Sequence, residues 1–215
     1  MQGLFEEELR SAMEHLILIK SHMIYLGKGL KLLNDVQYSP AGIVEIRRSS
    51  LDVRMIIEEL MLLSVSAHKN AGQKVTSALQ SSYSASKKMS LLRDLNPRFF
   101  PDAIDIVPID MPGVEGKFVS VEDAYLDATL AKERYHFSDN ILHASHKQIS
   151  PAGFYEAVTR LSSFYKLTER LFRTFEVDTS GSGMVFVGHL NLYSSGPPVL
   201  FSAGMNSDNI PKFAG

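Results

Sequence analysis

A mainly α-helical fold is predicted: an antiparallel helical bundle of about five helices with a C-terminal β-hairpin. Long stretches carry apolar residues at steps of three and four, which is the period of an amphipathic helix. Serine–proline pairs precede two of these stretches, in the order typical of a helix N-terminus. Near residue 178 this pattern gives way to two short stretches of strand-forming residues. We therefore predict a helical bundle domain over residues 1–177 and a hairpin appendage and tail, packed on the bundle, over residues 178–215.

The first two predicted helices are the longest. Residues 3–33 carry apolar side chains at the spacing of a bundle seam, and Asn34-Asp35 ends this helix. Ser39-Pro40 begins the next helix, whose central part is residues 43–69. Because apolar residues occupy more than half of its circumference, we expect other elements to surround this second helix.

Charged residues interrupt the apolar arc of the second helix. Arg47, Arg54 and Glu58 fall near its middle, whereas the opposite, solvent side receives Glu45, Asp52 and Glu59. An unpaired buried charge costs several kcal/mol, so charges within this arc must be paired or must line a cavity. Arg54 and Glu58 stand four residues apart and can pair along the helix, either as a structural ion pair or as part of a binding site.

The later elements are predicted from local signals. A serine-rich helix is expected over residues 73–95, followed by a proline-rich loop to about residue 119. Ser120-Val-Glu-Asp123 reads as a capping box, so we expect a helix from there to about Ser145. Ser150-Pro151 begins the last helix, which should reach about Phe175, and strands are expected over residues 184–193 and 199–203.

The fourth predicted helix carries the candidate catalytic and binding residues on one face. Tyr125, His136, Asp139, Asn140 and His143 share this face. A histidine beside acid, amide and hydroxyl groups can transfer protons near neutral pH, although a solvated helix face has the same composition.

Arg47 or Arg54 of the second helix is expected to face His143 across a groove. The guanidinium would then hold a phosphate while the imidazole moves a proton.

Metal, cofactor and membrane binding are not expected. The two histidine pairs His15/His22 and His136/His143 each place their rings roughly 10 Å apart, too far for one metal ion to take both. The chain has no P-loop, GxGxxG, HExxH or GxSxG motif, so we expect no cofactor. Lysines interrupt the apolar run 16–33, which excludes a spanning helix there, and the absence of cysteine favours a reducing, cytoplasmic location.

Charge is unevenly distributed along the chain. The net charge of −2 excludes an overall cationic nucleic-acid binder. Residues 71–100 are nevertheless basic and residues 101–145 acidic. The basic stretch is therefore interpreted either as a phosphate-binding strip or as the complement of an acidic neighbour within the fold or a dimer.

Four segments together suggest a family: the long first helix, RRSSLDVRMIIEELMLLSVSAHK, DLNPRFFPDAI and ERYHFSDNILHAS, followed by the hairpin. Over residues 10–200 the chain resembles uncharacterised bacterial proteins distantly related to the HEPN superfamily of helical RNases and nucleotide-binding domains. HEPN nucleases carry an arginine shortly before a histidine that matches His143. The arginine would stand at residues 136–138, where this chain has His136, Phe137 and Ser138. The resemblance implies a homodimer and a role in phage defence or a toxin–antitoxin system.

Three functions follow from these observations. The first is a non-catalytic or weakly active HEPN-like cytoplasmic protein that binds RNA, a nucleotide or a protein partner. The second is a metal-independent ribonuclease in which His143 acts with Arg54 or Arg47. The third is a structural subunit whose helix faces and hairpin serve assembly.

Overall fold

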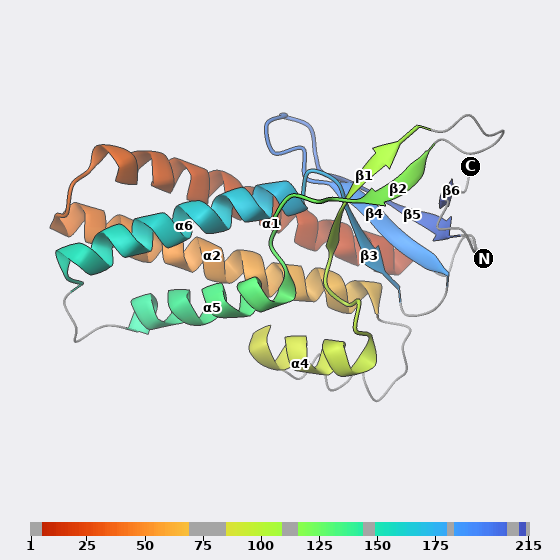
Figure 1. Ribbon diagram of the computed structural model, residues 1–215, viewed down its shortest axis with the longest axis horizontal. Coiled ribbons are helices and arrows are strands. Elements are labelled where there is room, and N and C mark those ends of the chain that lie inside the picture. Colours follow the sequence, from red (N-terminus) through yellow and green to blue (C-terminus); the bar gives the residue numbers. More distant parts are fainter. Residues whose placement is uncertain are drawn as a thin grey trace.

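The computed structural model describes residues 6–68, 85–108, 116–143, 149–179, 183–205 and 211–213. Helices make up one end of the molecule and strands the other (Figure 1). The helices are α1 (Glu6–Asp35), α2 (Pro40–Ala67), α4 (Ala85–Leu95), α5 (Ala128–His143) and α6 (Pro151–Leu171). Four of them form the bundle, and the shorter α4 packs against α2 and α5.

The predicted fold class is wrong, because the helices are joined by an antiparallel sheet and not by a terminal hairpin alone. Its strands are β1 (Asp102–Val107), β2 (Lys117–Ser120), β3 (Phe175–Asp178), β4 (Met184–His189), β5 (Val199–Met205) and β6 (Pro211–Phe213). They pair in the order β2-β1-β3-β4-β5-β6. The predicted hairpin exists as β4 and β5, but it lies inside this sheet. The predicted division after residue 177 falls within β3 and stays a prediction.

Two local predictions are wrong where the sheet begins. The stretch predicted as a loop contains β1 and β2, which pair from Ile104↔Ser120 to Val107↔Lys117. Ser120 therefore ends a strand and does not cap a helix. The cap of α5 comes later, where the Asp127 carboxylate accepts the amide N–H of Leu130 at 2.7 Å.

The predicted ends of the other helices are confirmed in part. Phe175 was predicted to end α6, but α6 ends at Leu171 and Phe175 begins β3. The first part of the helix predicted at 73–95 and the predicted end near Ser145 lie outside the described residues. The two serine–proline starts are confirmed, because Ser39 Oγ and Ser150 Oγ each accept an amide N–H three residues later at 3.1 Å.

The sheet uses its two faces differently. Phe175, Val177 and Phe186 join the main core, which is shared with the helices. Val185 and Val187, which alternate with Phe186 along β4, belong to a second cluster with Ile104, Phe118 and Ala203. One face of β4 therefore packs toward the bundle, and the other packs toward the β1–β2 hairpin.

The pairing of α1 with α2 contains buried polar contacts at seven-residue intervals. His15 Nδ1 lies 2.7 Å from Glu59 Oε2, and His22 Nδ1 lies 2.9 Å from Asp52 Oδ1. The prediction that Asp52 and Glu59 face solvent is wrong, because both are buried against α1. The histidines on the facing helix are the reason that carboxylates are tolerated there.

Gly29 lies seven residues after His22 on α1, opposite Glu45 and Ser49 of α2. A methyl group on Gly29 would lie 2.6 Å from Ser49 Oγ, and Ser49 is buried. The missing side chain therefore sets how closely the two helices approach.

We expect Gly29→Ala to lower the free energy of unfolding by about 1–2 kcal/mol, since overpacking outweighs the gain in helix propensity. Urea denaturation measures this change. Gly153→Ala on α6 is the matched control, because its methyl group would make only ordinary contacts, the nearest at 3.4 Å. A Gly29→Ala protein as stable as the parent would contradict the close approach.

His68 ties the C-terminal end of α2 to the turn that precedes β1. Its Nδ1 donates to Ser64 O at 2.7 Å, and its Nε2 lies 2.9 Å from Asn96 Nδ2, which donates. Asn96 Oδ1 in turn accepts the amide N–H of Arg98 at 2.9 Å. Burial lowers the pKa of His68, so the ring is neutral in the folded protein near neutral pH.

This linkage predicts acid destabilisation. Below about pH 6.5 the unfolded chain binds a proton at His68 that the folded chain does not, so stability falls as the pH decreases, by up to about 1.4 kcal/mol per unit. Denaturation between about pH 7.5 and about pH 5.5 should show this slope, and His68→Gln should reduce it. The raised pKa values of half-buried Asp102 and buried Glu176 act in the opposite sense and at lower pH. Equal slopes in the two proteins would refute the role of His68.

Candidate functional site

A cluster of charged and polar side chains joins α2 to α5. Arg54 Nε donates to Glu58 Oε1 at 2.9 Å, and Arg54 Nη1 donates to Asp139 Oδ1 at 2.7 Å. The hydroxyl group of Tyr135 donates to the same Glu58 oxygen at 3.1 Å. The arrangement follows from helix geometry, because Arg54 and Glu58 are one turn apart on α2, as are Tyr135 and Asp139 on α5.

His143 adds an imidazole at the end of the cluster. Its Nε2 lies 3.3 Å from Asp139 Oδ1, and its side chain is 73% exposed. Arg54 and His143 therefore contact the same oxygen of Asp139, and Glu58 accepts from the same guanidinium. The cluster is half-buried, with 29% of the Arg54 side chain and 28% of the Glu58 side chain exposed.

The charges within the cluster satisfy one another. Hydrogen bonding to Glu58 raises the pKa of Arg54, and burial together with Glu58 raises the pKa of Tyr135. The phenol therefore stays protonated and keeps donating to Glu58. The guanidinium also lies over the Tyr135 ring, with Cζ 5.3 Å from the ring centroid. One cation is thus shared by two carboxylates and one aromatic face.

Four predicted residues lie away from this centre. Arg47 is exposed on α2, which corrects its predicted place within a buried apolar arc. Asn140 is exposed, and His136 faces α4, with Nε2 3.4 Å from Ser86 Oγ. Tyr125 precedes α5 and does not share its face. These residues therefore do not extend the Arg54–Asp139–His143 cluster.

Tyr125 instead belongs to a carboxylate pair on the sheet. Its hydroxyl group donates to Asp102 Oδ1 at 3.4 Å, and Asp102 stands opposite Glu176 in the register of β1 and β3. Arg98 Nη2 donates to Glu176 Oε1 at 2.7 Å. Burial raises the pKa of both carboxyl groups, and the Arg98 charge opposes that rise. Arg98 and Tyr125 thus offset the repulsion expected between acids on paired strands.

Sequence reasoning missed a loop that is held on α1 by a buried lysine. The loop is residues 190–198 between β4 and β5, and the Lys20 ammonium donates to Asn191 O, Ser194 O and Gly196 O at 2.7, 2.9 and 2.6 Å. Asn191 has φ 52, a left-handed conformation that asparagine tolerates. A lysine among apolar residues of α1 was the signal for this contact, but nothing in the sequence indicates its carbonyl partners.

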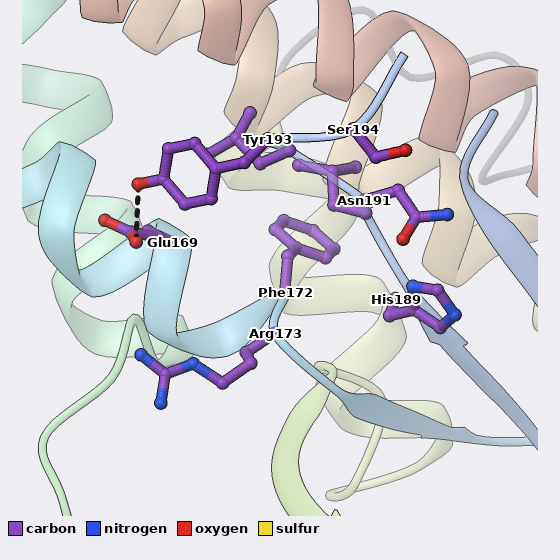
Figure 2. Close-up of a pocket in the computed structure, with 9 residues that line it drawn as sticks. Glu169, Phe172, Arg173, His189, Asn191, Tyr193 and Ser194 are labelled. Atoms are coloured by element: carbon purple, nitrogen blue, oxygen red, sulfur yellow. Dashed lines mark hydrogen bonds between the residues drawn. The ribbon is translucent and has the colours of Figure 1, made fainter. Parts of the chain in front are cut away.

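A hollow lies under this loop (Figure 2). Phe172 lies between Tyr193 on one side and Arg173 on the other, and His189 lies beside it. The Tyr193 hydroxyl group donates to Glu169 Oε1 at 2.6 Å, and this bond raises the pKa of Tyr193. Tyr193 is nevertheless 80% exposed, so one face of its ring is open to a ligand.

Comparison with known proteins identifies no relative: no family model, no curated protein and no solved structure matches the chain. None of the described helices is long and apolar enough to cross a membrane. Within the described ranges, no group of three or more acidic or histidine side chains is arranged to hold a metal ion.

Proposed function

We propose that the protein is a non-catalytic, HEPN-like binding protein that acts as a homodimer, with two copies associating through the exposed face of the α1–α2 pair. One observation carries this proposal: large apolar side chains gather on that face. They are Leu18 (44% exposed), Tyr25 (48%), Leu32 (51%), Val44 (65%) and Leu51 (48%). Of RNA, a nucleotide and a protein partner, an apolar helical face favours a protein partner.

These side chains share one continuous surface, which we call the α1–α2 face. Leu18, Tyr25 and Leu32 follow at seven-residue steps along α1, so they form one row beside α2. Arg48 of α2 places its guanidinium carbon 6.0 Å from the centroid of the Tyr25 ring. The α1 row therefore continues onto α2, where Val44 and Leu51 are exposed.

Charges along the α1–α2 face are arranged for two-fold pairing. Glu14, Ser21 and Lys28 form a neighbouring row, with the acid and the base seven residues on either side of the small serine. A two-fold axis near Ser21 would run the two α1 helices antiparallel and place Glu14 opposite the second copy's Lys28. Each dimer would then contain two such ion pairs flanked by apolar contacts.

A charge exchange tests this arrangement. Glu14→Lys or Lys28→Glu alone should weaken the dimer by about tenfold, because like charges then meet across the interface. The double variant should restore dimerisation, since the opposite charges still meet after the exchange. Light scattering after size-exclusion chromatography, over a range of protein concentrations, measures the dissociation constant.

Tyr25→Asp should give a monomer with unchanged helical content, and Lys132→Glu on the exposed face of α5 should leave the dimer intact. A parent protein that stays monomeric at about 100 μM would refute the homodimer, because a dissociation constant above about 100 μM is weaker than that of most specific protein–protein contacts. A double variant as weak as the single variants would refute the antiparallel arrangement.

The enzymatic alternative rests on the Asp139–His143 contact. An exposed imidazole beside a carboxylate favours proton transfer, but the neighbouring Arg54 is already bonded to Glu58 and Asp139. A phosphate would therefore approach two carboxylates with no unpaired guanidinium to receive it, which supports binding without cleavage.

Labelled single-stranded RNA incubated with the purified protein in EDTA should accordingly stay intact. His143→Ala should leave the result unchanged, and gel electrophoresis of the RNA measures it. Cleavage that resists EDTA and disappears in His143→Ala would instead establish the metal-independent ribonuclease.

A further inference from the structure

Two hollows lie side by side where α1 and α6 meet the β4–β5 loop. The first encloses about 540 Å³ and the second about 500 Å³, and Leu192 and Tyr193 line both. Each volume is within the range of about 300–1,000 Å³ that is typical of small-molecule sites. The two hollows therefore form one groove divided by the Tyr193 side chain.

The second hollow carries positive charge without compensation. Its rim holds Lys28, Lys31 and Lys166, all exposed, and no acidic residue lines it. Across the described ranges none of these lysines forms an ion pair. In the first hollow the acid is Glu169, whose carboxylate already accepts the Tyr193 hydroxyl group. Lys28 Nζ lies 5.6 Å from the centroid of the Tyr25 ring, so the cations that an anion in the second hollow would reach without breaking such a contact are Lys31 and Lys166.

The walls between these lysines are apolar. Ile24 and Leu30 of α1, Tyr165 of α6 and Leu192 of the loop line the second hollow. Gly27 allows the Tyr165 ring to lie against α1, since a methyl group at Gly27 would come within 3.2 Å of that ring. The surface thus offers flat apolar contact beneath a cationic rim.

The loop that closes the groove is held in place before any ligand binds. The Lys20 ammonium bonds to three loop carbonyl groups, and Asn191 Nδ2 donates to Pro197 O at 2.8 Å. Lys20 is buried, so these carbonyl groups replace its water. A site that is already ordered loses less conformational entropy on binding.

We propose that this groove binds a small organic anion with a flat apolar body. The body lies against Tyr193, Leu192 and Tyr165, and the carboxylate, sulfonate or phosphate group lies between Lys31 and Lys166. Such a ligand matches the groove in both shape and charge. An inorganic anion has no apolar body to contact the walls, and a neutral aromatic molecule has no charge to interact with the lysines.

The probe for this site is 1-anilinonaphthalene-8-sulfonate, which has both features. Titration of the full chain, followed by fluorescence and calorimetry, should show one saturable site per chain. The uncharged N-phenyl-1-naphthylamine, which has the same ring body, should bind at least about tenfold more weakly. Sodium sulfate at low millimolar concentration should not displace the probe.

Variants separate the two features. Lys31→Gln combined with Lys166→Gln should weaken binding of the sulfonate about tenfold and leave binding of the neutral amine unchanged. Tyr193→Ala should weaken both ligands. Lys132→Gln on α5, which also removes an exposed lysine, is the matched control and should bind as the parent does. Unchanged sulfonate affinity in the double lysine variant, or equal affinity of the parent for the two probes, would overturn the proposal.

Discussion

The antiparallel pairing of α1 with α2 is the constraint on which the other contacts depend. Seven-residue steps bring His15 against Glu59, His22 against Asp52 and Gly29 against Glu45 and Ser49. If α1 were shifted by one helical turn relative to α2, the buried carboxylates would lie opposite apolar side chains. A larger side chain would also replace Gly29 where the two helices approach most closely. Both outcomes are costly, because a buried acid needs a partner and a packed interface cannot absorb extra volume. Polar pairs therefore specify the register that apolar contacts alone would leave less certain.

Once this register is set, two further faces of the helices have defined neighbours. α2 turns Arg54 and Glu58 toward α5, where Tyr135 and Asp139 complete their hydrogen bonds. α1 turns Lys20 toward the β4–β5 loop and thereby attaches the sheet to the bundle. The outer row of α1 stays about half exposed: it carries Leu18, Tyr25 and Leu32, and Arg48 of α2 lies over only the Tyr25 ring.

Helices were predictable here because their signals are local. In Ser39-Pro40 and Ser150-Pro151 the serine hydroxyl group accepts an amide N–H of the first helical turn that has no partner within the helix. The Arg54–Glu58 pair follows from the four-residue spacing within one helix. Arg54 and His143 contact the same oxygen of Asp139, although Arg54 was expected within the apolar arc of α2 and His143 on the polar face of another helix.

The sheet and the buried acids were not predictable in the same way. β2 and β3 have four residues each, too few to show a period, and β3 lies directly after a helix of similar composition. β1 and β3 are stabilised by pairing with segments distant in the sequence. Asp52 and Glu59 fell on the less apolar side of α2, so solvent was the simplest neighbour. Their burial could be predicted only by knowing that His15 and His22 of α1 lie opposite these two acids.

The two groups of cations on this protein differ in what an incoming anion must displace. At the α2–α5 cluster an anion must separate Arg54 from Glu58 and Asp139, leaving two half-buried carboxylates without their partner. That loss opposes binding, because a carboxylate stripped of its partner keeps the cost of its desolvation. At the groove between α1 and α6, Lys31 and Lys166 form no ion pair with the described part of the chain, and both are exposed above an apolar wall. The same electrostatic reasoning therefore underlies both proposals, binding without cleavage at the Arg54–Asp139–His143 cluster and anion binding beside Tyr193.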